Sequence, residues 1–196
     1  MAALVAGAAC ADAPAAERAG SEEPGPAPAA ASAAMPASAP QSLDLAQLGM
    51  DRGSDDAPVR IVEFSDYGCG YCRKFHEETW PVLLRDFVDT GKVEWKFLPY
   101  VTGMFGNTTA ATTAAECVLE QGDTLFYAMN SRIWGHQAEW KRAADASAIL
   151  RELAHESGAD LMRYDSCLSQ GRRAQRVEAA GALAREVGVR GTPTFF

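Results

Sequence analysis

The chain has 196 residues, enough for one sizeable domain and a tail, and its 47% apolar and 22% charged residues are ordinary for a soluble globular protein. Its formal net charge of −8 argues against a nucleic-acid partner, because it offers phosphate groups no basic surface. No stretch approaches the roughly 20 apolar residues of a membrane-spanning helix. The five cysteines are too few for a small disulfide-scaffold protein.

The first residues predict export. Residues 1–9, MAALVAGAA, are small and apolar, and Cys10 follows directly, which resembles the processing site of bacterial lipoprotein signals. The run is short, has no preceding Lys or Arg, and carries Gly7 where leucine is usual. We therefore expect residues 1–10 to be an export or lipoprotein signal with Cys10 as candidate lipidation site. An Ala-rich disordered tail with a stray cysteine is the alternative.

Residues 11–42 predict a spacer. They contain six of the ten prolines and almost no large apolar side chains. Such a segment cannot bury enough surface to offset its ordering entropy, so we expect a disordered Ala/Pro-rich spacer that holds the following domain away from a membrane. The folded domain is expected over residues 43–196.

A strand–helix–strand unit comes next. Residues 57–67, APVRIVEFSDY, are rich in Val, Ile and Phe and predict a buried strand. A helix is expected from Cys69 to a stop at Gly91, and a second strand over residues 92–101. This order implies parallel strands joined by a right-handed crossover. The helical spacing is carried by Leu83, Leu84, Phe87 and Val88.

The remaining sequence is mostly helical in pattern. Glycine and aspartate signals divide residues 107–187 into several predicted helices. Residues 188–196, GVRGTPTFF, then predict an extended apolar segment, in which Pro193 is anomalous unless it marks a strand edge or a cis bond.

Cys69 and Cys72 form a CxxC motif at the beginning of the first predicted helix. A cysteine at a helix N-terminus faces unpaired backbone N–H groups, which stabilise its thiolate and lower its pKa below the ~8.5 of a free thiol. Cys72 lies one turn further on the same face, near enough to resolve a mixed disulfide. We therefore predict Cys69 as the nucleophile and Cys72 as its resolving partner, with Gly70 and Tyr71 tuning the redox potential.

Glu63 is a candidate acid–base residue. It lies in the first strand between Ile61, Val62 and Phe64, which leave no polar face for it. We expect a buried carboxyl beneath the dithiol, where it takes and returns the proton of Cys72. A solvent-facing Glu63 at a strand edge is the alternative.

These features together resemble the DsbA-like branch of the thioredoxin superfamily over about residues 57–196. The resemblance implies a thioredoxin fold of the α/β class with a large helical insertion at about 102–187. The family's fold continues with a further strand and a closing helix, so the chain is expected to be truncated after the Thr-Pro strand. A cis Thr192–Pro193 bond would pack against the cysteines, and Thr192, Pro193 and Tyr71 would bind an extended substrate peptide.

The resemblance also implies a function. We expect an exported thiol-disulfide oxidoreductase, in the periplasm or on the outer face of the envelope, that oxidises folding proteins with free thiols. It would need no cofactor, act as a monomer, and be reoxidised by a membrane thiol oxidase. The Gly-Tyr pair between the cysteines is associated with disulfide isomerases, so isomerase or reductase activity is the alternative. A non-catalytic peptide-binding or chaperone module is the alternative of another class, against which the intact CxxC argues.

Cys69, Cys72 and His76 share one helix face, which raises the alternative of a metal site. A structural zinc site needs a fourth ligand and usually a second close pair, and neither is visible, so we predict no metal. We expect His76 to be a helix-surface residue near the site that contributes to redox tuning.

Cys117 and Cys167 fall on apolar helix faces within the predicted insertion. Two buried free thiols are one interpretation. In an exported protein a bridge between them is favoured, and some DsbA-like relatives carry a second disulfide in the insertion. We predict a structural disulfide with Cα atoms roughly 4.4–6.8 Å apart.

Overall fold

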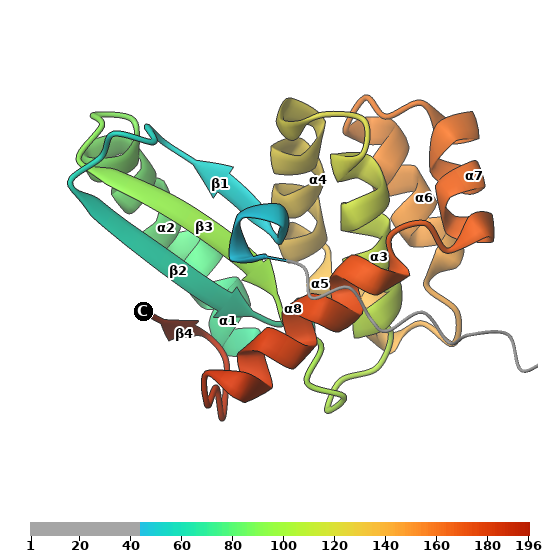
Figure 1. Ribbon diagram of the computed structural model, residues 1–196. Coiled ribbons are helices and arrows are strands. Elements are labelled where there is room, and N and C mark those ends of the chain that lie inside the picture. Colours follow the sequence, from blue (N-terminus) through green and yellow to red (C-terminus); the bar gives the residue numbers. More distant parts are fainter. Residues whose placement is uncertain (1–43) are drawn as a thin grey trace, which may run out of the picture. The chain divides into compact units, whose positions relative to one another are not determined.

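The computed structural model describes residues 44–196, which Figure 1 shows coloured along the chain. The predicted signal (1–10), its candidate lipidation site Cys10 and the predicted spacer (11–42) lie outside the described residues. Among the residues that are described, no helix has the length and apolar character to cross a membrane.

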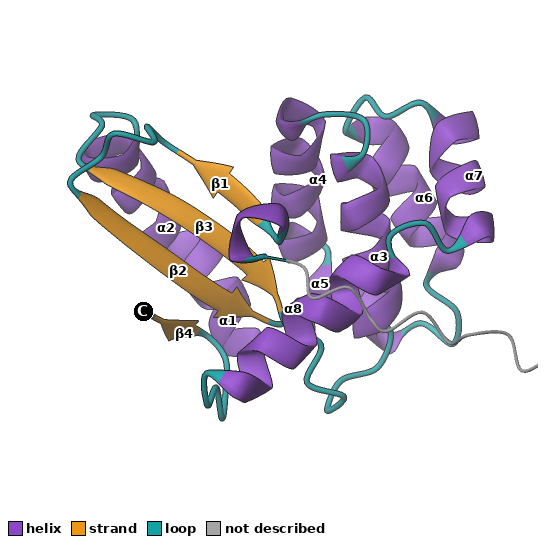
Figure 2. Cartoon of the chain, in the orientation of Figure 1, coloured by secondary structure: helices purple, strands orange, loops and turns teal. Residues whose placement is uncertain are grey.

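Four strands form one mixed sheet in the order β1-β3-β2-β4 (Figure 2). The two central strands β2 and β3 are parallel, as predicted, while β1 and β4 run antiparallel to their neighbours. All seven residues of β3 are buried, which is typical of a strand covered on both faces. The strands are β1 (Met50–Arg52), β2 (Val59–Ser65), β3 (Val93–Pro99) and β4 (Thr194–Phe195).

The crossover between β2 and β3 is one continuous helical segment with two wider, π-helical turns. Pro81 lacks the N–H that would bond the carbonyl four residues earlier, and one of the π-helical turns directly precedes its helix. Gly91, with φ of 72°, ends the segment as predicted. Its parts are α1 (Gly70–Lys74), η2 (Phe75–Thr79), α2 (Trp80–Leu83) and η3 (Leu84–Val88).

The helical insertion packs around an apolar cluster that also includes Met50 of β1, Phe97 of β3 and the side chains of Cys69 and Cys72. Two further clusters lie on the faces of the sheet. A short helix in the insertion, α5, was not predicted from the sequence. Helices α3, α4, α6 and α7 stand together beside the sheet (Figure 1). The bounds of these helices, with α5 included, are α3 (Thr108–Leu119), α4 (Asp123–Gly135), α5 (Gln137–Arg142), α6 (Ser147–Glu156) and α7 (Leu161–Gln170).

The last helix, α8 (Ala174–Glu186), packs on the sheet. Its Ala180 and Ala184 join Phe64 of β2 and Leu98 of β3 in one buried cluster. The predicted insertion of residues 102–187 therefore ends in a helix that covers the sheet. Because α8 takes one face, the crossover helices take the other, where Trp95 and Ile61 lie.

A short 3-10 helix, η1 (Leu45–Gln47), and strand β1 precede the predicted unit, and neither was expected from the sequence. The Nζ of Lys96 in β3 reaches across to the Asp51 carboxylate of β1 at 2.6 Å. This partly buried ion pair anchors the short strand to the sheet.

Candidate active site

The loop after β2 is held by the buried carboxylate of Asp66. This side chain accepts hydrogen bonds from the backbone N–H of Gly68 (2.8 Å) and of Thr102 (2.8 Å), and also from the hydroxyl of Thr108. The N–H of Cys69 donates to the carbonyl of Asp66 at 2.9 Å. These bonds fix the turn so that Cys69 becomes the residue that caps the start of α1.

The two cysteines are free thiols with different surroundings. Cys69 is 5% exposed, whereas Cys72 is fully buried. Burial raises the pKa of Cys72 to about 12, although the nearby Ser65 and Thr192 hydroxyls and the backbone of Asp66 act in the opposite direction. Cys72 is therefore a protonated thiol at neutral pH, beneath the more accessible Cys69.

The predicted cis proline lies directly beside the first cysteine. The Thr192–Pro193 bond is cis, and the Sγ of Cys69 donates to the Thr192 carbonyl oxygen over 3.3 Å. The segment that follows, β4, pairs with β2 so that Phe195 is opposite Glu63. This pairing holds the segment with the cis proline next to the Sγ of Cys69.

Glu63 is fully buried on the central strand, as predicted, and the solvent-facing alternative is wrong. One carboxylate oxygen accepts the hydroxyl of Ser65 and lies 2.8 Å from the Nε2 of His76. The other accepts the indole N–H of Trp95 at 2.9 Å. Contacts with these three polar partners replace the hydrogen bonds that the carboxylate would form with water.

The prediction that His76 lies on the helix surface is wrong. His76 follows Cys72 by four residues and so shares the buried helix face that points at the sheet. Its ring stacks on the indole of Trp134, with centroids 4.7 Å apart, and meets the edge of Phe97. The aromatic contacts orient the imidazole so that its Nε2 faces Glu63.

Gly70 and Tyr71 lie at the outer side of the motif. A side chain at Gly70 would meet nothing within 4 Å, and Tyr71 is 79% exposed. Their position between the cysteines is compatible with the predicted roles in redox tuning and substrate contact, which remain predictions.

Helix α5 holds the same loop from the opposite side. The side-chain amide of Gln137 donates to the carbonyls of Tyr67 (2.6 Å) and Cys69 (2.9 Å). One turn later, the Nζ of Lys141 donates to the carbonyl of Gly68 at 2.6 Å. Three consecutive carbonyls are thus bound by one helix of the insertion.

Sequence reasoning missed several of these residues. Ser65 follows Glu63 by two positions, and the two-residue period of a strand would have placed both on one face. No comparable local signal exists for Gln137 and Lys141, since their partners are about 70 residues away in the chain.

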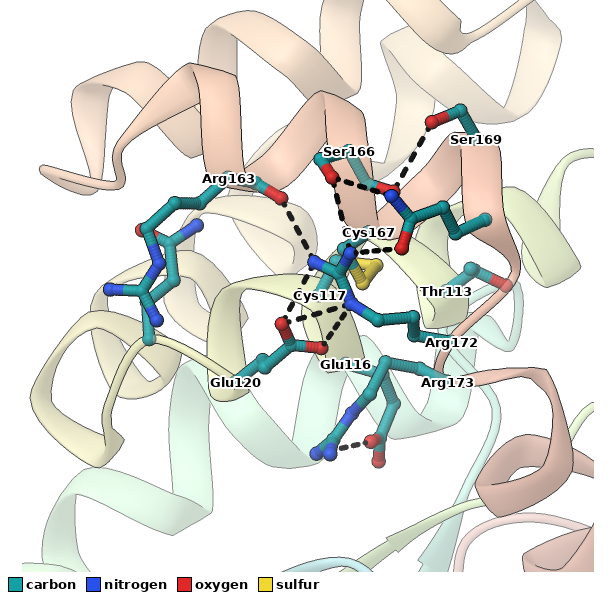
Figure 3. Close-up of a disulfide and its surroundings, with 12 residues drawn as sticks. Thr113, Glu116, Cys117, Glu120, Arg163, Ser166, Cys167, Ser169, Arg172 and Arg173 are labelled. Carbon is teal, nitrogen blue, oxygen red and sulfur yellow. Dashed lines mark hydrogen bonds and ion pairs between the residues drawn. A yellow bond between two sulfur atoms is a disulfide. The ribbon is translucent and has the colours of Figure 1, made fainter.

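The structure joins Cys117 of α3 to Cys167 of α7 by a disulfide with a Cα–Cα distance of 5.7 Å, inside the predicted range (Figure 3). Both residues are almost completely buried. Figure 3 also shows the Arg172 guanidinium bound to the Glu120 carboxylate beside the bridge, at 2.9 Å. Within residues 44–196, no three His, Cys, Asp or Glu side chains are grouped so that they could hold a metal ion.

Comparison with known proteins identifies the family. The thioredoxin family model matches residues 46–196. Disulfide bond formation protein D of Bacillus subtilis is 27% identical over 147 residues, which are 74% of this chain and 65% of that protein. The Na(+)/H(+) antiporter NhaA 3 of Salinispora tropica is 36% identical over 145 residues, but these make up only 21% of the antiporter. The chain therefore spans less than two thirds of either relative.

A solved structure supports the same assignment. The crystal structure of oxidised BdbD from Bacillus subtilis matches with a TM-score of 0.68 and 26% identity, covering 74% of this chain and 79% of that chain. With its CxxC motif, cis proline and helical insertion in place, the chain belongs to the thioredoxin family, in the DsbA-like branch of that superfamily.

Proposed function

We propose that this protein is an exported thiol-disulfide oxidoreductase, and that it acts as a dithiol oxidase on folding proteins. One observation carries the proposal. The Sγ of Cys69 lies at a helix start and 3.3 Å from the Thr192 carbonyl, while Cys72 is buried behind it with a raised pKa. This arrangement offers one sulfur to a substrate and keeps the other inside.

In the oxidised form, a substrate thiolate attacks the Sγ of Cys69, because Cys72 has no exposed surface. A substrate–Cys69 disulfide forms, the Cys69–Cys72 bond breaks, and its electron pair leaves on Cys72. A second substrate thiolate then attacks the substrate sulfur and displaces Cys69. Two substrate thiols lose two electrons and two protons in all, and the protein's disulfide becomes two thiols.

The departure of Cys72 requires a proton. A thiolate with a pKa of about 12 is a poor leaving group. The Ser65 hydroxyl lies near this thiol and donates its own hydrogen to Glu63, so Ser65 and Glu63 form a path along which a proton reaches Cys72. His76, bound to the same carboxylate, positions it.

Substrate binding follows from the same geometry. The carbonyl of Thr192 next to the cis proline borders the sulfur, so an extended substrate chain would pair with this backbone and contact the exposed ring of Tyr71. We propose that the substrates are exported proteins with free thiols, and that a membrane thiol oxidase restores the disulfide.

Isomerase activity is a second candidate, and the Gly70-Tyr71 pair between the cysteines favours it. The two activities separate with two substrates: a reduced unfolded protein, and the same protein with scrambled disulfides. A dithiol oxidase oxidises the first and leaves the second unrepaired without a reductant. Efficient repair of the scrambled protein would favour the isomerase.

Trapping tests the assignment of the two cysteines. A single-cysteine peptide is supplied as its mixed disulfide with thionitrobenzoate. Cys69 of the Cys72→Ser variant should displace the thionitrobenzoate and retain the peptide as a mixed disulfide, because no neighbouring thiol releases it; mass spectrometry detects the adduct. Cys69→Ser should trap none. Equal trapping by both variants contradicts the assigned roles.

Export and lipidation need their own test, because residues 1–10 lie outside the described structure. Bacterial cells that express the full chain should carry it in the envelope fraction. Cys10→Ala should release it from membranes if Cys10 is lipidated. A full chain found only in the cytoplasm contradicts the proposed export.

A further inference from the structure

A groove of about 340 Å³ beside the active site has an unusual lining. Its charged lining residues are all cations, and Met104 and Phe105 add an apolar surface. We call it the cationic groove and define it by Arg73, Met104, Phe105, Lys141 and Arg142. No carboxylate of residues 44–196 lines it, although acidic residues exceed basic ones by 26 to 18 in the chain.

The cationic groove adjoins a second groove that the reactive cysteine lines. The second groove, of about 460 Å³, is lined by Cys69 and Tyr71 and shares Arg73 and Phe105 with the first. Both signs of charge occur in this second groove, where Lys74 lies 3.9 Å from Glu78. A polypeptide that reacts at Cys69 therefore has a balanced surface under its cysteine and a cationic one next to it.

The positive charges of the cationic groove are poorly neutralised. Arg142 is exposed and forms no ion pair within the described part of the chain. Lys141 donates to a backbone carbonyl and lies 4.4 Å from the ring centroid of Phe105, and it forms no ion pair with any carboxylate that the structure describes. The Nε of Arg73 is buried without a hydrogen-bond partner among the described residues, and its one carboxylate contact, with Glu77, is 3.9 Å long.

The apolar part of the groove is equally open. Met104 is 68% exposed, and Phe105 lies beneath the Lys141 ammonium group. A flexible methionine next to weakly neutralised cations suits a polypeptide that brings apolar and acidic side chains together.

We propose that the cationic groove binds the part of the substrate polypeptide that flanks the reacting cysteine, and that it selects substrates with acidic side chains there. This inference rests on the proposed oxidase function and names the class of substrate. Exposed ion pairs contribute modestly, so the preference is a matter of a several-fold change in rate.

The test compares peptides with two cysteines that differ only in a flanking pair of residues: Glu-Glu, Gln-Gln or Lys-Lys, on the N-terminal or the C-terminal side. The oxidised protein should oxidise the Glu peptide about three- to tenfold faster than the Lys peptide at low ionic strength, on the side that reaches the groove. Because salt screens exposed charges, about 1 M salt should remove most of the difference.

Two variants assign the preference to this surface. Arg142→Glu should abolish or invert the Glu-to-Lys rate ratio, and the milder Arg142→Gln should reduce it. Arg163→Glu makes the same charge change on the exposed face of α7 and should leave the ratio as in the unmodified protein.

Oxidation of dithiothreitol, a small uncharged dithiol, distinguishes a failure of the substrate preference from a failure of the proposed oxidase function. If dithiothreitol is oxidised but the Glu and Lys peptides react equally fast, the cationic groove does not select substrates. A preference that survives Arg142→Glu unchanged likewise overturns the assignment to this groove. Failure to oxidise dithiothreitol contradicts the proposed function itself.

Discussion

At the scale of single residues, the site depends on a carboxyl group that the fold encloses completely. Glu63 stands on the central strand and is bound by Ser65, His76 and Trp95. A buried carboxyl is costly, and here three polar partners offset that cost. We propose that this carboxyl transfers a proton to and from the buried thiol of Cys72.

Replacing Glu63 by Gln tests this role. The amide keeps the shape of the side chain but cannot exchange the proton that Cys72 needs. We expect the oxidation of a substrate dithiol to slow by about tenfold or more near neutral pH, with the fold retained. Stopped-flow measurement of the rate against pH checks this.

Glu94→Gln is the matched control, because Glu94 is a buried carboxylate of the neighbouring strand that binds Arg60 instead. It should leave the pH profile of the rate unchanged. If Glu63→Gln also leaves rate and pH profile unchanged, Glu63 has no part in the proton transfer.

The raised pKa of Cys72 predicts how stability depends on pH. The thiol ionises near its ordinary value of 9.0 in the unfolded chain, but only at about 12 in the folded protein. Its stabilising contribution is therefore complete below pH 9 and is lost as the pH rises toward 12. At pH 10 the loss amounts to about 1.4 kcal/mol.

Urea unfolding of the reduced protein measures this loss. Cys72→Ser lacks the titrating thiol, so its free energy of unfolding should fall less between pH 8 and pH 10 than that of the unmodified protein. A parallel fall in both proteins means that Cys72 titrates alike in the folded and unfolded states.

At the scale of elements, the insertion supports the catalytic loop. Gln137 of α5 donates to two carbonyls of that loop, and Lys141 donates to the one between them. Helix α5 therefore binds carbonyl groups of the loop, whereas Asp66 binds its N–H groups. We infer that the insertion positions Cys69 as well as covering the site.

Gln137→Met removes both donors while keeping the length of the side chain. Buried carbonyls left without a partner should lower the free energy of unfolding by about 2 kcal/mol. Gln121→Met is the control, because Gln121 also donates to a backbone carbonyl, that of Asp160, but at an exposed site. Equal small losses in both variants would show that the α5 contacts are dispensable.

The disulfide connects two other elements of the insertion, α3 and α7. Closing a loop of 50 residues stabilises the folded chain by about 4 kcal/mol in the chain-entropy model. The double variant Cys117→Ala/Cys167→Ala should lose stability of that order in urea unfolding. A loss below about 1 kcal/mol contradicts this structural role.

The same bridge should resist reduction. Its two cysteines are almost inaccessible, whereas Cys69 lines a groove at the surface. Dithiothreitol at a concentration that fully reduces Cys69–Cys72 should leave Cys117–Cys167 oxidised. Alkylation followed by peptide mass spectrometry identifies the labelled cysteines, and label on Cys117 and Cys167 contradicts the expectation.

At the scale of the whole domain, local patterns were sufficient for the main architecture. The apolar run around Glu63 and the CxxC motif led to the parallel strands and the helix start, whereas the cis Thr192–Pro193 bond was implied by the family resemblance. The strands and the helix start are encoded by neighbouring residues, through side-chain period and turn residues.

The missed features depend on distant contacts. Strand β1 has three residues, too few for a period to register, and is held by pairing with β3. Burial of His76 depends on Trp134 of the insertion, and α8 covers the sheet through alanines that are not a distinctive core pattern. A single sequence contains no local signal for such packing partners.

The central claim is that the Cys69–Cys72 pair is an oxidising disulfide, and its equilibrium with glutathione tests this most directly. Cys69 is the N-cap residue of α1, and the positive end of a helix dipole favours the reduced dithiol over the disulfide, which raises the reduction potential. The ratio of reduced to oxidised protein across a series of glutathione buffers gives that potential. We predict a value between about −120 and −180 mV, the range of strong oxidants and disulfide isomerases. A value near −270 mV, that of thioredoxin, would contradict the oxidase and support a reductase.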